Sequence, residues 1–454
     1  MSERLFGTNG VRGVVNEDMT VQLALGVGKA IGTFMGGKVA IATDTRTSAH
    51  MIKSAVSAGL MASGVEVLDL GMLPTPALQY YVKGSAVKGG VMITASHNPP
   101  EFNGIKCVDY DGTEMPRHKE EMIEAIYFNQ SFAQKSWRTV GSMRPITGVG
   151  QTYITVVRRQ VDHAAIEDAK LKVVLDCANG AGSATSPQLL ESLGVKAITL
   201  NANPQGTFPG HESEPTPENL RDLVEMVKVT GADLGIAHDG DADRCIFVDD
   251  KGNYLYGDRS LAIVARYVVI ERGGGTVVTP VSTSSCLEDV VRAAGGEVVY
   301  TKVGSPVVAR KMIEVKAIFG GEENGGLIFP EHQYCRDAAM TMAKVLEIIA
   351  KDGPLSRLAA SIPGYALDKR KMHTPPGVKD QVVEELLMRF DGMRVDTTDG
   401  VKVYFDEGWA LIRPSGTEPI FRIYSEARSD QAAKRIGDEC EKALKEAVKE
   451  CQGD

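Results

Sequence analysis

Three absences narrow the classes of protein to which this 454-residue sequence can belong. The seven cysteines are odd in number and none stands in a CxxC spacing, which argues against a disulfide framework and a cysteine-ligated zinc site. No uninterrupted apolar run approaches the roughly 18 residues that a membrane helix needs, and the opening residues MSERLFGTNG lack the apolar core of a signal peptide. We therefore expect a soluble, cytoplasmic protein with reduced thiols and no membrane partner.

An excess of positive charge is absent too. The formal net charge is -9 and the pI is about 5.6, so the composition gives no electrostatic reason to expect a nucleic acid partner. A local basic pocket for a small anionic substrate is compatible with this balance, and so is a homodimer. Hydrophobic residues make up 43% of the chain, which is enough for a large core divided over roughly three or four domains.

Three similar units repeat along most of the chain. Each unit begins with a β-rich run that enters a polar or glycine-rich turn, and these runs start at Lys38, Leu171 and Gly275. After a helix-length interval, a glycine precedes a second strand, at Gly64, Gly194 and Gly295. A third strand then ends in an unusual loop: VMITASHNP, LGIAHDGDADR or AIFGGEENGG. Because functional groups collect at the carboxyl ends of strands in parallel α/β sheets, the three loops are expected to face a shared cleft.

The pattern changes beyond residue 363. We predict an α/β fold with three similar mixed α/β domains around a central cleft, over residues 1–150, 151–252 and 253–366, and a smaller α+β C-terminal domain over 367–454. In that last domain VKVYF, WALIRPSG and FRIYSEA are predicted strands. A terminal helix capped at Ser429 would place four residues on one core stripe: Ala432, Ile436, Cys440 and Ala443.

The segment MITASHNPPEFNGIK, residues 92–106, places a serine where a strand ends. The β-favouring residues of the strand lead into Ser96, and turn-forming residues continue after it. A strand that ends on an exposed serine before a stiff loop is how a fold presents a nucleophile, and it is also how many ordinary loops begin. The segment alone leaves both interpretations open.

The segment DGDADR places Asp239, Asp241 and Asp243 at alternate positions after an apolar strand. Three carboxylates that bend toward one point repel one another unless a cation compensates them, and hard oxygen ligands favour Mg²⁺ or Ca²⁺ over zinc. A solvated acidic turn is the alternative. An EF-hand is disfavoured, because Arg244 and Cys245 follow where its loop would continue, and Cys245 itself is expected only to pack in the core. Mg²⁺ commonly completes its coordination with water or phosphate oxygen.

Two further loops suit a sugar phosphate. In RPSGTEP, residues 413–419, hydroxyls and an open backbone stand near guanidinium groups, a combination that fits a phosphate dianion as well as a plain turn: Arg413, Ser415, Gly416, Thr417 and Arg422. In GGEENGG, Glu322 and Asn324 could bind hydroxyl groups, or they could decorate an ordinary glycine-rich turn.

Taken together and in this order, the four motifs resemble the α-D-phosphohexomutase family, and the resemblance covers essentially the whole chain. TASHNPPEFNGIK is similar to the phosphoserine loop of that family, DGDADR to its metal loop, GGEENGG to its sugar-binding loop and RPSGTEP to its phosphate-binding loop. The opening LFGTNGVRG resembles the phosphoglucosamine mutase branch and would place Arg12 at the active site. The fold that the resemblance implies, three similar α/β domains and a smaller fourth, agrees with the repeat.

The resemblance implies a phosphohexomutase in which Ser96, when phosphorylated, gives its phosphate to a sugar monophosphate and recovers phosphate from the hexose bisphosphate. One Mg²⁺ would be held by Asp239, Asp241, Asp243 and a phosphoserine oxygen. Arg12, Lys106 and Arg244 would assist. Lys106 would be the acid or base, although a lysine that only holds phosphate is the alternative. His97 is either a second proton-transfer group or a residue that shapes the loop.

One departure from the family concerns the choice of sugar. Many relatives have Ser-Gly-His in the sugar loop, whereas this chain has Asn324-Gly325-Gly326 and offers no histidine there. TKVGSP, which contains Gly304, resembles the specificity loop. Glucosamine 6-phosphate and glucosamine 1-phosphate are the expected pair. The alternatives are a broad phosphoglucomutase/phosphomannomutase, a non-catalytic sugar-phosphate binding protein, and a Mg²⁺-dependent phosphatase.

Overall fold

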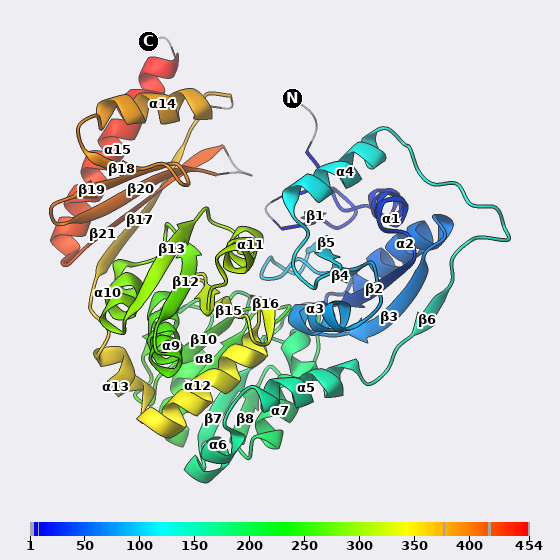
Figure 1. Cartoon of the computed structure of the whole chain (residues 1–454), viewed down its shortest axis with the longest axis horizontal. Coiled ribbons are helices and arrows are strands. Elements are labelled where there is room, and N and C mark those ends of the chain that lie inside the picture. The colour runs from blue at the N-terminus through cyan, green and yellow to red at the C-terminus, as the bar shows by residue number, and fades with distance from the viewer. Residues whose placement is uncertain (1–3, 8, 376, 416–418, 453–454) are drawn as a thin grey trace.

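The computed structural model describes residues 4–7, 9–375, 377–415 and 419–452. Within these residues the strands form four sheets that follow one another along the chain, and each sheet with its helices is called a domain below. Figure 1 shows the first domain in blue and cyan, the second and third from green to yellow, and the fourth in orange and red.

The first domain has a sheet in the order β1-β5-β4-β2-β3-β6. Its strands are β1 (Val11–Val14), β2 (Lys38–Thr43), β3 (Glu66–Met72), β4 (Gly89–Ile93), β5 (Phe102–Asp109) and β6 (Met143–Pro145). Its helices are α1 (Val21–Met35), α2 (Ala49–Ala62), α3 (Thr75–Gly84) and α4 (Arg117–Phe128). β2 and β4 are almost entirely buried, which explains why they read as apolar runs rather than as alternating strands.

The second domain has the order β11-β10-β9-β7-β8. Its strands are β7 (Lys172–Asp176), β8 (Lys196–Leu200), β9 (Leu234–His238), β10 (Cys245–Val248) and β11 (Tyr254–Leu255). Its helices are α5 (Val149–Arg159), α6 (His163–Ala169), the short 3₁₀ helix η1 (Ala181–Ala184), α7 (Ser186–Ser192) and α8 (Arg221–Thr230).

The third domain has the order β13-β12-β14-β15-β16. Its strands are β12 (Gly275–Pro280), β13 (Gly296–Thr301), β14 (Phe319–Gly321), β15 (Leu327–Phe329) and β16 (Gln333–Arg336). Its helices are α9 (Gly257–Arg272), α10 (Ser285–Ala293), α11 (Ser305–Val315), α12 (Ala338–Asp352) and α13 (Leu355–Ala360). α12 begins after Asp337, whose side chain accepts a hydrogen bond from the backbone N–H of Met340.

The first three sheets share one plan, as the sequence repeat predicted. In each, the first strand of the repeat (β2, β7 or β12) pairs in parallel with the second and the third. The third strand then pairs antiparallel with the next strand along the chain, β5, β10 or β15. The three unusual loops therefore leave equivalent strands, β4, β9 and β14, at the same ends of their sheets.

The fourth domain has an antiparallel sheet in the order β17-β21-β20-β19-β18. Its elements are β17 (Ala366–His373), α14 (Lys379–Arg389), β18 (Arg394–Asp396), β19 (Val401–Phe405), β20 (Gly408–Pro414), β21 (Ile420–Ala427) and α15 (Asp430–Gln452). The Ser429 hydroxyl accepts a hydrogen bond from the backbone N–H of Ala432, as predicted for a helix cap. The predicted fold of three α/β domains and a smaller α+β domain is confirmed.

The described hydrophobic residues show how the domains are joined. A continuous core cluster contains residues of the first three domains, from Ala40 to Ile362, whereas the fourth domain has a separate cluster. Val281 of the third domain packs against Trp409 and Leu411 of the fourth in a small cluster of their own. The cysteines of the described chain are free thiols, and none of its helices combines the length and apolar character that crossing a bilayer requires.

Candidate active site

Ser96 follows β4 and lies against the acidic loop of the second domain. Its backbone is left-handed (φ +54°), which is uncommon for a residue with a side chain. Ser96 Oγ donates to Asp239 Oδ2 (3.0 Å), and His97 Nδ1 lies 3.3 Å from Ser96 Oγ. Only 1% of Ser96 is exposed, so the expectation of an exposed serine is wrong. The acidic loop covers it: a Cβ on Gly240 would lie 2.6 Å from the Ser96 carbonyl oxygen, so this contact requires glycine.

Arg46, which no motif singled out, fixes the shape of the serine loop. Its guanidinium donates to four backbone carbonyls of that loop, those of Ser96 (2.9 Å), Asn98 (2.6 Å), Pro99 (2.6 Å) and Phe102 (2.8 Å). It also pairs with Asp44 at 3.1 Å, and both side chains are fully buried. Removing one partner of such a pair typically costs about 3–5 kcal/mol, because a buried charge is left uncompensated. The one sequence signal was the DTR turn that ends β2.

The acidic loop gathers three buried carboxylates, whose nearest oxygens lie within 4.8 Å of one another: Asp239, Asp241 and Asp243. Lys106 Nζ and Thr75 Oγ1 both donate to Asp241 Oδ2, at 2.7 and 2.6 Å. Oδ1 of Asp241 and Oδ1 of Asp243 are buried and have no hydrogen-bond partner among the described residues. Unpaired buried acceptors are costly unless a cation or water meets them. This donor set therefore fits a hard divalent cation.

The electrostatics of the loop agree with this interpretation. Burial, together with the charges of Asp243 and Asp241, raises the pKa of Asp239 to about 8. Burial also opposes the ionisation of Asp241, but Lys106, Thr75 and Arg336 together outweigh it and hold the pKa of Asp241 below the usual range for an aspartate. The protein thus holds Asp241 ionised but disfavours the ionised form of Asp239, and a bound cation would favour that form.

Three more side chains lie near Ser96 and the acidic loop: Arg12, Arg244 and His97. Arg12 Nη1 donates to Asn98 Oδ1 (2.8 Å), and Arg244 Nε is 3.9 Å from an oxygen of Asp239. In the described part of the chain, Nε of Arg12 and Nε of Arg244 are buried donors without a hydrogen-bond acceptor. Burial lowers the pKa of His97 to about 2, and the charges of Arg244 and Arg12 act in the same direction. His97 is therefore neutral, beside two cations that are suited to an anion.

The loop after β14 brings Glu322 to the acidic loop. Glu322 is 3% exposed; its Oε1 accepts from the backbone N–H of Gly304 (3.1 Å) and its Oε2 from Arg336 Nη1 (3.1 Å). The Asn324 side chain bonds within its own turn, to the backbone N–H of Gly326 (3.1 Å). The backbone N–H of Cys245 donates to the Gly325 carbonyl (3.0 Å), which joins this loop to β10. Cys245 itself is fully buried, as expected of a packing residue.

The fourth domain contributes Arg413 from β20, opposite Arg422 in the β20–β21 register. Arg413 Nε donates to Asp399, which also accepts from the backbone N–H of Val303 in the segment TKVGSP. Arg413 and Gly304 line the same cavity, of about 590 Å³, between the first, third and fourth domains. The Ser415 carbonyl accepts a hydrogen bond from Lys379. Gly416 and Thr417, the rest of the predicted cradle, lie outside the described residues.

Comparisons with known proteins find family matches along most of the chain. Sequence models described as phosphoglucomutase/phosphomannomutase alpha/beta/alpha domains I, II and III and its C-terminal domain match residues 3–134, 151–252, 256–365 and 378–443. The chain belongs to the phosphoglucomutase/phosphomannomutase family. This membership confirms the resemblance drawn from the four motifs, and with it the enzyme class, a phosphohexomutase isomerase.

Relatives within the phosphoglucomutase/phosphomannomutase family match over nearly their full lengths. A phosphoglucomutase/phosphomannomutase of Thermococcus kodakarensis is 43% identical, covering 98% of this chain and 99% of the relative. A probable phosphoglucosamine mutase of Methanopyrus kandleri is 42% identical with the same coverage. The crystal structure of a family protein from Burkholderia thailandensis has a TM-score of 0.88 at 30% identity and covers 98% of this chain and 97% of that one.

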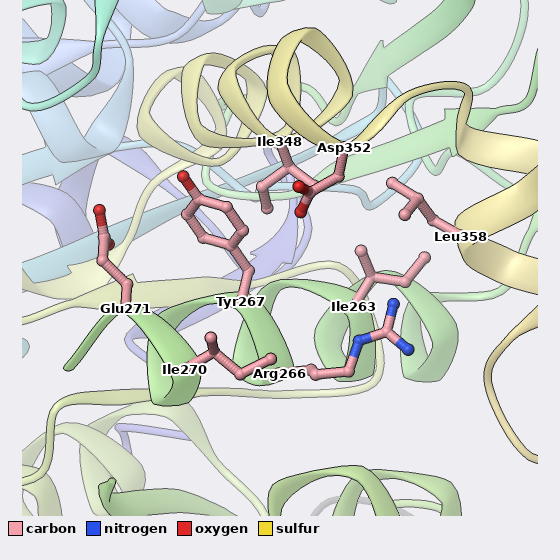
Figure 2. Close-up of a pocket in the computed structure, with 8 residues that line it drawn as sticks. All are labelled: Ile263, Arg266, Tyr267, Ile270, Glu271, Ile348, Asp352 and Leu358. Atoms are coloured by element: carbon pink, nitrogen blue, oxygen red, sulfur yellow. The ribbon is translucent and has the colours of Figure 1, made fainter. Parts of the chain in front are cut away.

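A second cavity, of about 300 Å³, lies outside these family motifs (Figure 2). Its side chains come from α9, the end of α12, and α13: Ile263, Arg266, Tyr267, Ile270, Glu271, Ile348, Asp352 and Leu358. Figure 2 shows apolar and charged groups facing one another across it without a cluster of like chemistry. We assign it no part in the active site.

Proposed function

We propose that this phosphohexomutase interconverts glucosamine 6-phosphate and glucosamine 1-phosphate through a phosphoserine at Ser96. The observation that carries the proposal is the hydrogen bond from Ser96 Oγ to Asp239 within a buried carboxylate cluster that fits a cation. A phosphoryl group on Ser96 Oγ would lie beside that cluster and beside Arg12 and Arg244. Loss of the group to a sugar hydroxyl breaks the bond to Ser96 Oγ and yields a hexose bisphosphate, which returns its other phosphate to the serine.

Asp239, Asp241 and Asp243, with a phosphoserine oxygen, would hold one Mg²⁺ per chain. When bound, Mg²⁺ neutralises charge that develops on the transferring group. Protein donors occupy Oδ2 of Asp241 and Oδ2 of Asp243, so each of these residues offers one remaining oxygen. Arg12 and Arg244 would hold the phosphoryl oxygens.

Lys106 is the preferred proton-transfer group. Its ammonium lies 2.7 Å from Asp241 and 3.6 Å from Asp243, within the site, and is 3% exposed. His97 is close to Ser96 Oγ, but its lowered pKa makes it a weak base, which supports a role in shaping the loop. Glu322, Asn324 and Gly304 would bind the sugar.

The fourth domain would hold the phosphate that is not being transferred. Arg413, Arg422 and the loop of Ser415, Gly416 and Thr417 offer guanidinium, hydroxyl and backbone donors for it. Between the two transfers the hexose bisphosphate turns around, so this cradle would bind either of its phosphates in turn. A small supply of free hexose bisphosphate would therefore activate the enzyme by phosphorylating Ser96.

The assay that tests the proposal uses glucosamine 1-phosphate, Mg²⁺ and a catalytic amount of hexose bisphosphate. We expect glucosamine 6-phosphate to form without matching release of inorganic phosphate. Phosphate release without isomer would indicate the phosphatase, and binding without turnover would indicate the sugar-phosphate binding protein. Mass measurement in solution and cell fractionation would test the homodimer and the cytoplasmic location, which stay predictions.

The choice of glucosamine is supported by the N-terminal motif, whereas the relatives divide between phosphoglucosamine mutase and phosphoglucomutase/phosphomannomutase. Glu322→Gln is expected to lower kcat/KM for glucosamine 6-phosphate roughly ten-fold more than for glucose 6-phosphate. A carboxylate gains about 1 to 2 kcal/mol more from a cationic amino group at C2 than from a hydroxyl.

Parallel kinetics on glucosamine, glucose and mannose phosphates measure this difference. Glu323→Gln, at the neighbouring and half-buried position, is the matched control and should leave the ratio unchanged. Equal losses on all three sugars would make Glu322 a general clamp for the hydroxyls that they share. The enzyme would then be a broad phosphoglucomutase/phosphomannomutase.

A further inference from the structure

Arg336, the last residue of β16, lies among carboxylates from three domains and belongs to none of the four motifs. Its Nη2 donates to Asp243 Oδ2 of the acidic loop (2.6 Å), and its Nη1 donates to Glu322 Oε2 of the sugar loop (3.1 Å). Glu114 of the first domain is 3.9 Å away. The residue is 6% exposed, so these carboxylates replace the water that a guanidinium would otherwise bind.

The side chain of Arg336 also fills the space beside Gly326. A Cβ built on Gly326 would lie 2.2 Å from Cδ of Arg336 and 2.9 Å from its Cγ. The Gly326 backbone is outside the left-handed region, so its conformation would accept other residues. Arg336 is the main obstacle to them, and Oδ1 of Asn324 lies 3.1 Å from the same Cβ position. Position 326 is where a Ser-Gly-His loop would carry its histidine, and that histidine and Arg336 cannot both occupy this space.

The contacts of Arg336 set the direction of two functional carboxylates. Glu322 has one oxygen on the Gly304 backbone and the other on Arg336, which holds its carboxylate plane. Asp243 has Oδ2 on Arg336, and its Oδ1, without a hydrogen-bond partner in the described chain, remains for a cation. One rigid, planar group therefore links the sugar loop to the acidic loop by bridging two carboxylates, each held by one Nη atom, a geometry that the single ammonium of lysine cannot reproduce.

We propose that Arg336 is a positioning residue that occupies the place of the missing loop histidine and holds Glu322 in register with Asp243. The residue acts through these carboxylates and not on the substrate. The inference rests on the proposed function, because Glu322 is taken to bind the sugar. Its steric part, the exclusion of a side chain at position 326, does not depend on any substrate.

The kinetic test is a cycle of Arg336→Met, Glu322→Gln and the double variant, with kcat/KM measured on glucosamine 6-phosphate. Arg336→Met is expected to lower kcat/KM at least ten-fold. Because both changes disturb the same carboxylate, the loss in the double variant should be smaller than the product of the single losses by three-fold or more. The positioning role would be overturned if the loss in the double variant were less than three-fold smaller than the product of the single losses. Arg336→Lys should recover only part of the activity, since an ammonium does not bridge both carboxylates in the same geometry.

Lys83→Met is the matched control. Lys83 also joins the first domain to the third, through the His332 carbonyl (2.7 Å), and it belongs neither to the acidic cluster nor to the cavity that Gly304 and Arg413 line. Its kcat/KM should stay within about three-fold of the wild type. When the control substitution is combined with Glu322→Gln, the total loss should equal the product of the two single losses. A control that behaves like Arg336→Met would show that any bridge between these domains has the same effect, and the proposal would fail.

The steric test measures Tm. Gly326→His is expected to lower Tm by about 3 to 8 °C through overpacking against Arg336. In the Arg336→Ala background the same substitution should lower Tm by less than half as much. An equal drop in both backgrounds, or no drop in the wild type, would overturn the claim that Arg336 fills this space. Wild-type protein that interconverts no hexose phosphate would refute the proposed function, while this measurement would still decide the placement of Arg336.

Discussion

Ser96→Ala is expected to lower mutase turnover by at least about 10³-fold while the protein remains folded. The substitution removes the atom that would carry the phosphoryl group, and the Thr94 hydroxyl at the same end of β4 is buried and donates to Asp44 (2.6 Å). The fold should tolerate it, because Ser96 Oγ contacts only Asp239 and His97 among the hydrogen bonds of the described structure. Intact-mass measurement should show a phosphate adduct on the wild type that is missing from the variant.

Ser57→Ala is a suitable control, since Ser57 is a buried serine on α2 with no hydrogen-bond partner for its hydroxyl among the described residues. It should retain both turnover and the phosphate adduct. Ordinary mutase turnover in Ser96→Ala would show that the phosphoryl carrier lies elsewhere.

Asp241→Asn is expected to weaken Mg²⁺ binding and to lower turnover by about 10²-fold, with partial recovery at excess Mg²⁺. The change nearly preserves shape but removes the charge that Lys106 and Thr75 now stabilise through Oδ2. Calorimetric titration of the metal-free protein with Mg²⁺ measures binding independently of turnover. Wild-type enzyme treated with EDTA should lose activity and regain it when Mg²⁺ is restored.

Asp249→Asn provides the comparison for this prediction. Asp249 is also buried in the second domain, but its side chain accepts hydrogen bonds from Lys251 and Asn253 in the turn after β10. Its substitution should leave the Mg²⁺ affinity unchanged. Full wild-type activity in EDTA, with metal analysis showing none retained, would refute the metal site.

The sequence predicted the parts of this molecule that depend on local pattern. The β-rich runs that start at Lys38, Leu171 and Gly275 form the strands β2, β7 and β12 in the structure. Each of these strands has two parallel neighbours. Functional groups collect at the carboxyl ends of parallel strands, and this rule was enough to predict that Ser96 and the aspartates lie close together. The four domain boundaries and the role of each site residue stay predictions.

The parts that sequence reasoning missed depend on contacts between distant segments. Arg336 stands 93 positions from Asp243 in the chain, and nothing near it in the sequence marks it as a partner of the acidic loop. Arg46 stands 50 positions before Ser96. The burial of Ser96 was missed for the same reason, since its cover comes from another domain. Long-range pairing of this kind carries no periodic signal in a single sequence.

The continuous core of the first three domains has a consequence for the catalytic cycle. Ser96, the aspartates and Glu322 are attached to strands that share this core, so separating them would expose its apolar side chains to water. The fourth domain meets the third at the small cluster of Val281, Trp409 and Leu411. Far less apolar surface has to be uncovered there, so this junction is the weak boundary of the molecule. We therefore expect any opening that admits or releases a substrate to occur at this boundary, where a substitution would change the rate of exchange without changing the rate of the chemistry.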